Sequence, residues 1–464
     1  MKTTTLWMLL LLCTSLATPA AAQNFPVDTL VKTGPLDRRI NLVFIPDGYE
    51  AAEMPLFLTR VNQTLTSLFA ESPFREYRSY FNAFAIKVPS VQSGSTHPRT
   101  APDCGAVAPF TADTYFGNTF DFAGIHRLLA TRQTGTIGTV LLRNFPSYDQ
   151  VFVLVNSPVY GGSGGQFATF SADRSATEIA LHEVGHSLAL LADEYWAGQP
   201  RETANMTQTT NSATVRWAPW IGANEVGIYP HTTDPTWQKP HRNCKMQFLG
   251  SPFCSVCKEA LVERFHTLAS PLQAYSPTSL AITNPAQDLQ FSLSLLAPTP
   301  NTLKVTWTRD GTVFARNTSV VTVSLAQVSS GRHQIRAVVV DTTALTRRTT
   351  HFTQHSYTVD WTINSTVTGV SLASATAEYE VEVYPNPVGD VLNLKYVLPR
   401  RTPVILTVLD AVGRTVKTIR YNRQAPGRYQ HQLSVEDLGV RKAGAYTLLL
   451  NVDGVPIAHQ LVKQ

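Results

Sequence analysis

The spacing of apolar residues changes along this chain of 464 residues and limits the fold of each part. Residues 24–272 combine unbroken apolar runs, at 40–45 and 151–155, with apolar residues at three- and four-residue spacing over 54–69. This combination predicts strands and helices in one α/β region. From residue 276 to 368 apolar residues recur at every second position, which predicts the short strands of a β-sandwich.

The remaining sequence predicts a second all-β region and the boundaries between the parts. Asp310-Gly311 predicts a hairpin turn within the sandwich, because the positive φ angles of such a turn suit Gly and Asp. Small residues at 371–380 predict a linker. We therefore expect a multidomain chain with these parts: an α/β domain at 23–272, an immunoglobulin-like sandwich at 273–370 and an all-β domain at 381–464.

The first 22 residues have the pattern of a secretory signal. A lysine at position 2 is followed by an apolar core at 6–16 and by small residues up to Ala22, where we expect cleavage. An apolar stretch of about 11 residues is too short to cross a membrane, which needs about 20. Leu12 precedes Cys13 where a lipoprotein signal has a small residue, so we do not expect lipidation. The sequence predicts an exported chain without a transmembrane segment.

Composition and charge exclude several classes of protein. Hydrophobic residues make up 43% of the chain and charged residues 15%, with a mean hydropathy near zero, as in globular proteins. The net charge of +5 is small and scattered, which excludes nucleic acid as an expected partner. We expect a monomer.

Four cysteines follow the signal, and their number bears on the redox compartment. They are Cys104, Cys244, Cys254 and Cys257. An even number in an exported chain favours disulfides over free thiols, and the spacing leaves the pairing open. The alternative is a zinc knuckle formed by the last three cysteines with a nearby histidine such as His241.

A helix with two histidines carries the strongest chemical signal. Ser175 and Glu178 have the spacing of a capping box, so the helix is expected to start there. An apolar stripe follows, formed by Leu181, Val184, Leu188 and Leu191. His182 and His186 point away from this stripe and lie one turn apart, where both can bind one Zn²⁺. Glu183 can accept a proton from a water that the ion activates and return it to the leaving amine.

A third protein ligand is needed to hold the ion and leave one position open. Asp193 is the leading candidate, with Glu194 next, and then Glu259 or Glu263 on a helix expected over 258–265. On an unbroken helix Asp193 would lie about 16 Å from His182 along the axis. The chain must therefore break and fold back after His186.

The histidine helix resembles a known family. The residues that carry the resemblance are His182-Glu183-x-Gly185-His186, Leu191-x-Asp193-Glu194-Tyr195, 41–49, 160–165, Cys244-Lys245-Met246 and 253–257. They resemble the IgA-peptidase-like metallopeptidases, the igalysin group of the metzincin clan. The resemblance implies a metzincin-like α/β fold, zinc ligands His182, His186 and Asp193, Glu183 as general base, and Met246 beneath the metal. The chain departs from the wider clan in having Ala189 where that clan has Gly, and its third ligand one residue later.

The C-terminal block has a second resemblance. Its landmarks are Tyr384-Pro385-Asn386-Pro387, Leu392-Asn393-Leu394, the turn Asp410 to Arg414 and Gly444-Ala445-Tyr446. They look like the C-terminal sorting domain of type IX secretion, which implies export to the medium or outer-membrane surface of a Gram-negative bacterium. The alternative is a sandwich used for adhesion.

The sequence thus predicts a secreted zinc endopeptidase that hydrolyses extracellular proteins. Its expected partners are a protein or peptide substrate and the type IX secretion machinery. The alternative from another class is a surface adhesin or glycan-binding protein with a degenerate peptidase domain. Gly161 to Gly165 also match Gly-x-Ser-x-Gly, but an extended segment rather than a helix follows Ser163, so we do not expect a serine nucleophile. An edge strand that pairs with an extended substrate is the preferred interpretation of this run.

Overall fold

The computed structural model describes residues 24–106, 108–195, 201–328, 331–365, 379–452 and 454–464. They form two compact units. The first contains the chain up to Gln273 together with 295–304 and 339–357, and the second contains 274–294, 305–338 and 358–464. The predicted signal at 1–22 and most of the predicted linker, 371–378, lie outside the described residues. No helix in the described part of the chain is long and apolar enough to span a membrane.

A six-stranded sheet forms the centre of the first unit. Its strands, in spatial order, are β1 (Val27–Val31), β3 (Phe81–Ile86), β2 (Ile40–Asp47), β6 (Gln150–Val155), β8 (Ala168–Ser171) and β7 (Gly162–Ser163). The four inner strands are parallel, and β1 and β7 are antiparallel edges. All residues of β2, β3 and β6 are buried, as expected for parallel strands that are covered on both faces. The two strand predictions in this region are confirmed.

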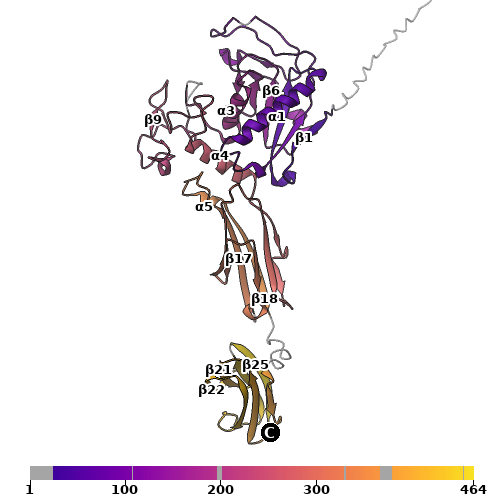
Figure 1. Cartoon of the computed structure of the whole chain (residues 1–464), viewed down its shortest axis with the longest axis vertical. Helices are drawn as coiled ribbons and strands as arrows, with labels where there is room; N and C mark the ends of the chain where they lie inside the picture. Colours follow the sequence, from indigo (N-terminus) through magenta and orange to yellow (C-terminus); the bar gives the residue numbers. More distant parts are fainter. Residues whose placement is uncertain (1–23, 107, 196–200, 329–330, 366–378, 453) are drawn as a thin grey trace, which may run out of the picture. The chain divides into compact units, whose positions relative to one another are not determined.

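Helices cover both faces of this sheet. They are α1 (Met54–Ala70), α2 (Thr134–Asn144), α3 (Ala176–Ala189) and α4 (Ser255–Leu268). The short α5 (His351–Gln354) contacts α4 through His351. Leu42 and Phe44 of β2 share a core with α1, α3 and α4, whereas Val43 and Ile45 share a second core with α2, because successive side chains of a strand point to opposite faces. Figure 1 shows α1, α3 and α4 gathered at the N-terminal sheet.

The sheet of the first unit is supplemented by short elements in its loops. These are the two-residue strands β4 (Asn118–Thr119), β5 (Ala130–Thr131), β9 (Tyr229–Pro230) and β10 (Gln238–Lys239). The helix predicted over 258–265 is confirmed and is longer at both ends, and the helix predicted over 54–69 matches α1.

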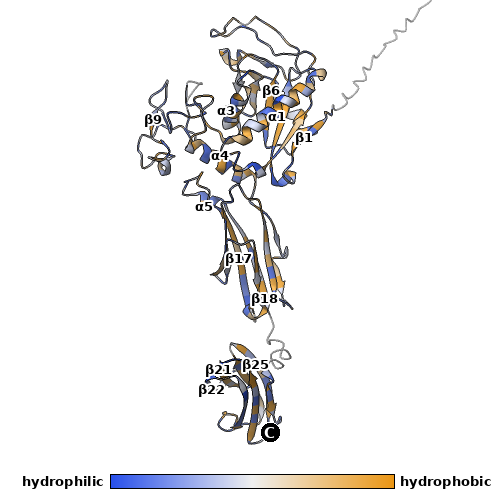
Figure 2. Ribbon diagram, in the orientation of Figure 1, coloured by the Kyte–Doolittle hydropathy of each residue, from blue (hydrophilic) through white to orange (hydrophobic). Residues whose placement is uncertain are grey.

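Two packed sheets form the region predicted as a sandwich. One contains β11 (Leu272–Ser276), β13 (Leu289–Leu295) and β16 (Val320–Val323), and the other β12 (Ala281–Thr283), β14 (Leu303–Arg309), β15 (Thr312–Arg316), β17 (Gly331–Asp341) and β18 (Ser356–Ser365). Phe291 of one sheet packs 4.9 Å from Trp361 of the other. The hairpin at Asp310-Gly311 joins β14 to β15, and both residues have positive φ. Figure 2 shows polar and apolar residues interleaved along β17 and β18.

The C-terminal block is also all-β, as predicted. One sheet contains β19 (Glu382–Tyr384), β20 (Val391–Leu398) and β23 (Gly427–Ser434), and the other β22 (Thr415–Gln424), β21 (Thr402–Leu409), β24 (Gly444–Val452) and β25 (Val455–Lys463). Leu392, Leu394 and Tyr396 are buried in one core with Leu406 and Val408 of the opposite sheet. The alternation in the sequence therefore marks the inner face.

Candidate metal centre

Helix α3 starts where the sequence predicts, but the predicted capping box is absent. Ser175 precedes the helix, and its side chain makes no capping hydrogen bond. The Glu178 carboxylate instead accepts hydrogen bonds from Lys245 Nζ and from the backbone N–H of Gly250, both at 2.7 Å. The prediction of a capping box was wrong, because the Glu178 carboxylate bonds to a lysine and a loop N–H that are distant in sequence and not to the backbone at the start of the helix.

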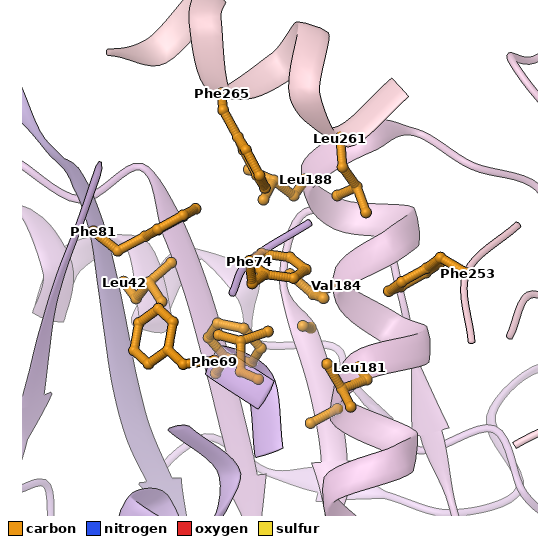
Figure 3. Packing of buried hydrophobic residues seen from close by; sticks show 14 of the residues in the cluster. Leu42, Phe69, Phe74, Phe81, Leu181, Val184, Leu188, Phe253, Leu261 and Phe265 are labelled. Atoms are coloured by element: carbon orange, nitrogen blue, oxygen red, sulfur yellow. The ribbon is translucent and has the colours of Figure 1, made fainter. Parts of the chain in front are cut away.

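The apolar stripe of α3 anchors the helix in the core. Leu181, Val184 and Leu188 are buried. Figure 3 shows Leu188 near Leu261 and Phe265 of α4, and Val184 and Leu181 further along α3. His182 and His186 face a cleft of about 960 Å³ on the other side. The predicted apolar face is confirmed for Leu181, Val184 and Leu188, whereas Leu191 lies beyond the end of α3 and lines the cleft with the histidines.

The helix ends just after the second histidine. Leu190 adopts the left-handed conformation, with φ 55° and ψ 33°, and the N–H groups of Leu190 and Leu191 bond back to His186 and Gly185. This conformation costs a residue with a side chain about 1–2 kcal/mol. Asn205 offsets part of the cost, since its side chain bonds both backbone groups of Ala192. The chain therefore folds back, as the sequence requires.

The fold-back brings Asp193 to the two histidines. Asp193 Oδ1 lies 2.9 Å from His182 Nε2 and 3.3 Å from His186 Nε2, and the two Nε2 atoms are 3.1 Å apart. Ligands bound to zinc at 2.0–2.1 Å in a tetrahedral arrangement lie about 3.3 Å from one another. Two imidazoles and a carboxylate at these distances fit a Zn²⁺ ion.

The outer nitrogens of both imidazoles are fixed by backbone carbonyls. His182 Nδ1 lies 2.9 Å from the oxygen of Lys245, and His186 Nδ1 lies 2.7 Å from the oxygen of Leu191. A carbonyl only accepts, so each Nδ1 carries the proton and donates it. Each Nε2 lone pair is therefore free to face the common point near Asp193, which is the usual arrangement of metal-binding histidines.

Burial and charge set the protonation of the groups around this point. Burial raises the pKa of Glu183. Burial alone would lower the pKa of His186, but the hydrogen bond with Asp193 outweighs it and raises that pKa to about 9. The Asp193 carboxylate therefore favours positive charge at this point, either a proton on His186 Nε2 or a metal ion that takes the place of that proton. Glu183 has a greater proton affinity than an exposed glutamate.

The glycine-rich run lies directly over the histidine face. A Cβ on Gly162 would meet Glu183 Oε1 at 2.6 Å, and a Cβ on Gly164 would meet the Cβ of His186 at 2.3 Å. Only glycine allows edge strand β7 and the residues after it to pass this close. The Ser163 hydroxyl donates to the oxygen of Leu129 at 2.6 Å, and extended β8 follows, so this serine is not placed as a nucleophile.

Substitution of Gly164 by alanine is expected to displace His186. We expect a 10- to 100-fold weaker affinity for a divalent metal ion, the range found when groups that orient a metal ligand are disturbed. Gly165→Ala is the matched control, because a Cβ at Gly165 meets no atom within 4 Å. Zinc titration against a competing chelator measures both variants. Equal affinities in the two variants would contradict the close approach at His186.

The other candidates for third ligand face different partners. Glu194 points into a group of cysteines. Glu259 accepts hydrogen bonds from Trp220 Nε1 and from the N–H of Arg347. Glu263 binds two histidines of the first unit, described below. Of the candidates, Asp193 is the one that lies beside His182 and His186.

Met246 is buried under α3. Its Sδ lies 2.7 Å from the position that a Cβ on Gly185 would take, and its carbonyl oxygen accepts the N–H of Glu194. The methionine therefore packs against the middle of the histidine helix and supports the chain that carries Asp193.

Sequence reasoning missed several groups in this unit. Arg127 and Tyr160 line the cleft, and the Arg127 guanidinium lies 5.6 Å from the centre of the Tyr195 ring. Arg127 comes from a loop without a recognisable motif, whereas Tyr160 begins the run 160–165 that carries the family resemblance and had no role of its own there. His351 Nδ1 and His355 Nε2 lie 2.7 and 3.0 Å from the two oxygens of Glu263 in a separate buried cluster. The four-residue spacing of these histidines was the one available signal.

Comparison with protein families finds two matches in this chain. Residues 29–233 match the model of the IgA peptidase M64 family, and residues 382–464 match that of the secretion system C-terminal sorting domain. The chain carries an IgA peptidase M64 domain. Membership of this peptidase family indicates a metallopeptidase hydrolase, in agreement with a buried group of two histidines and a glutamate. The matched residues contain α3, Asp193 and most residues that line the cleft, while residues 247–249 of its lining lie beyond the match.

The sorting domain fixes the destination of the M64 domain. It indicates type IX secretion to the outer surface, and hence contact with that secretion machinery. Both family resemblances expected from the sequence are confirmed. Comparison with curated proteins finds no match.

Solved structures with distant likeness cover only part of the chain. Dimeric latent PorU from Porphyromonas gingivalis is 14% identical over 41% of this chain and 20% of its own, with a TM-score of 0.16. Fibronectin(III)-like modules of Clostridium thermocellum CbhA are 12% identical over 41% of this chain and 93% of their own, with a TM-score of 0.15. The chain thus spans about a fifth of PorU. At these scores neither likeness carries a conclusion.

Proposed function

We propose that this protein is a secreted zinc-dependent endopeptidase that cleaves extracellular proteins. The observation that carries the proposal is the convergence of His182 Nε2, His186 Nε2 and Asp193 Oδ1 in an open cleft, with Glu183 on the same helix. Three protein ligands leave a coordination position for water or substrate, as catalytic zinc sites require. A metzincin-like fold, with Met246 beneath the site, is part of the proposal.

The residues of the chain have separate tasks in peptide hydrolysis. Zn²⁺ held by His182, His186 and Asp193 would supply Lewis acidity, which polarises the substrate carbonyl and acidifies water. Glu183 accepts the proton of the attacking water and then gives it to the leaving amine. Burial raises the pKa of Glu183, which suits a group that must take up a proton and release it in turn. The carbonyls of Lys245 and Leu191 hold the imidazoles in place.

The substrate is proposed to lie extended in the cleft beside Gly164 and Gly165, which follow β7 and line the cleft. Gly162 of β7 passes over Glu183, and Gly164 passes over His186. The N–H of Gly162 donates to the oxygen of Arg127 and its oxygen accepts from the N–H of Leu129, so an edge open to substrate begins after Ser163. Extended peptides add to such edges through main-chain hydrogen bonds. The family name refers to immunoglobulin A, but a fold does not transfer specificity. The proposed substrate class is therefore extracellular protein.

Loss of Asp193 tests the proposed ligand set. Asp193→Ala should remove zinc from the cleft and abolish caseinolysis, because two imidazoles alone hold the ion weakly. Asp113→Asn is the matched control, since Asp113 is exposed and does not line the cleft. Zinc content by mass spectrometry and hydrolysis of casein, with and without a chelator, are measured together. Chelator-resistant hydrolysis, or full activity of Asp193→Ala, would contradict the proposal.

A further inference from the structure

Three thiols and a carboxylate meet in the core of the first unit, outside the cleft. Cys257 Sγ lies 3.6 Å from the Sγ atoms of both Cys244 and Cys254. It also lies 3.9 Å from Glu194 Oε1. The four donor atoms all lie within 4.8 Å of one another, and all four residues are buried. None of the four lines the cleft that holds His182 and His186.

The sulfur positions match metal ligands rather than disulfides. A disulfide bond is about 2.05 Å long, whereas two thiolates at 2.3 Å from a tetrahedral zinc lie about 3.8 Å apart. All four cysteines of the described chain are free thiols, so the disulfides that their even number favoured are not confirmed. Cys104 belongs to another group, with Asp121 and His126. Any disulfide within the cluster would therefore leave one of its three sulfurs without a partner.

The carboxylate brings a separate indication of a cation. Glu194 is fully buried, and its Oε2 has no hydrogen-bond partner, while Oε1 accepts from Asn205 Nδ2 at 3.0 Å. A buried charged oxygen without a partner is strongly unfavourable. Lys239 lies nearby, but its Nζ donates to Gln247 Oε1. A cation among the thiolates would satisfy this oxygen.

We propose that Cys244, Cys254, Cys257 and Glu194 bind a second, structural Zn²⁺. Four protein ligands close the coordination sphere, which is typical of structural and not of catalytic zinc. Cys254 and Cys257 have the two-residue interval of many zinc ligands and lie at the start of α4. Glu194 takes the place that sequence reasoning gave to His241, whose ring faces Glu225 and the N–H of Asn243 instead. Burial protects the thiols from oxidants outside the cell.

The second zinc would fasten the chain that supports the cleft. Glu194 follows Asp193 directly, and its N–H donates to the oxygen of Met246. Cys244 precedes Lys245, whose oxygen holds His182 Nδ1. One ion would thus join the loop after α3, the turn at Met246 and the start of α4. This consequence rests on the proposed function, whereas the site itself does not.

Zinc stoichiometry of the full secreted chain tests the inference. We expect two zinc ions per wild-type chain, one in Cys257→Ser, one in His182→Ala and two in the matched control Cys104→Ser. One ion in the wild type that is lost in His182→Ala and kept in Cys257→Ser would overturn the inference and leave the proposed function intact. One ion that is kept in His182→Ala and lost in Cys257→Ser would support the structural site and contradict the proposed function.

Two measurements on the wild type decide the question even if Cys257→Ser does not fold. Titration of thiols after denaturation in chelator should find all four cysteines of the described chain, whereas a disulfide in the cluster would leave two. Cobalt(II) in place of zinc should give the near-ultraviolet charge-transfer band of thiolate ligands, which His182, His186 and Asp193 cannot produce. Two titratable thiols, or the absence of this band, would overturn the inference.

Discussion

Replacement of Glu183 by glutamine is expected to lower kcat for peptide hydrolysis by about 10²- to 10⁴-fold, the usual contribution of a general base. Glutamine has the same shape but cannot accept the proton of water or return it to the amine. The fall should appear in kcat more than in KM, because the proposed substrate contacts beside Gly164 and Gly165 remain. Initial rates on a peptide substrate at several concentrations measure the effect.

The Glu183 variant must be shown to keep its metal. His182, His186 and Asp193 approach one another without Glu183, so zinc content should equal that of the wild type. Glu225→Gln is the matched control, since Glu225 is exposed and far from the histidine helix in sequence. If Glu183→Gln keeps the wild-type kcat, Glu183 is not the general base. A wild-type chain that hydrolyses nothing, yet binds a host ligand, would favour the adhesin.

The parts of the fold that depend on local pattern could be predicted from the sequence. Strands β2 and β6, helices α1 and α3 and the alternating strands of the β-regions follow from the spacing of apolar residues, which reflects burial directly. The break after His186 followed from distance alone. Ala189 still ends the helix, and Leu190 makes the turn one residue later than a glycine at 189 would. Asp193, at eleven residues from His182, reaches the site because of this delay.

The parts that depend on distant partners could not be predicted. The spacing of Ser175 and Glu178 predicts a capping box, yet Lys245 and Gly250 bind the Glu178 carboxylate. The sequence offers Glu194 only as an alternative to Asp193 as third ligand, whereas its side chain lies beside Cys257. Segment 339–357 lies in the first unit, far beyond the predicted end of the α/β domain at residue 272. The spacing of residues along the sequence does not predict contacts between residues that are distant in the chain.

Replacement of Glu263 by glutamine is expected to destabilise the first unit by about 3 kcal/mol, because it leaves buried His351 without its carboxylate. Glu263 also binds His355, and the carboxylate oxygens of Glu263 face a nitrogen of each histidine. Each group in this cluster is therefore satisfied without an ion. Hydrogen exchange of peptides from α4 in increasing urea measures the free energy of unfolding of this unit.

The contribution of this cluster should depend on pH in both directions. Burial would raise the pKa of Glu263, but its bonds with His351 and His355 hold it well below the usual range, so its contribution is present above about pH 4.3 and is lost as the pH falls further. Burial would lower the pKa of His351, but Glu263 raises it, so its contribution is present below about pH 6.5 and is lost as the pH rises through the folded value. The difference between wild type and Glu263→Gln should be largest between these two values.

Glu259→Gln on the same helix is the matched control for this prediction. Glu259 is also buried, but its donors are neutral: the indole of Trp220, the hydroxyl of Thr346 and the backbone N–H of Arg347. All three donate to one oxygen, which glutamine keeps, so we expect a cost of about 1 kcal/mol without a maximum between the two pH values. If Glu263→Gln costs no more than Glu259→Gln at pH values near 5.5, the His351 imidazole is not charged in the folded chain, and the cluster stabilises the unit only as neutral hydrogen bonds do.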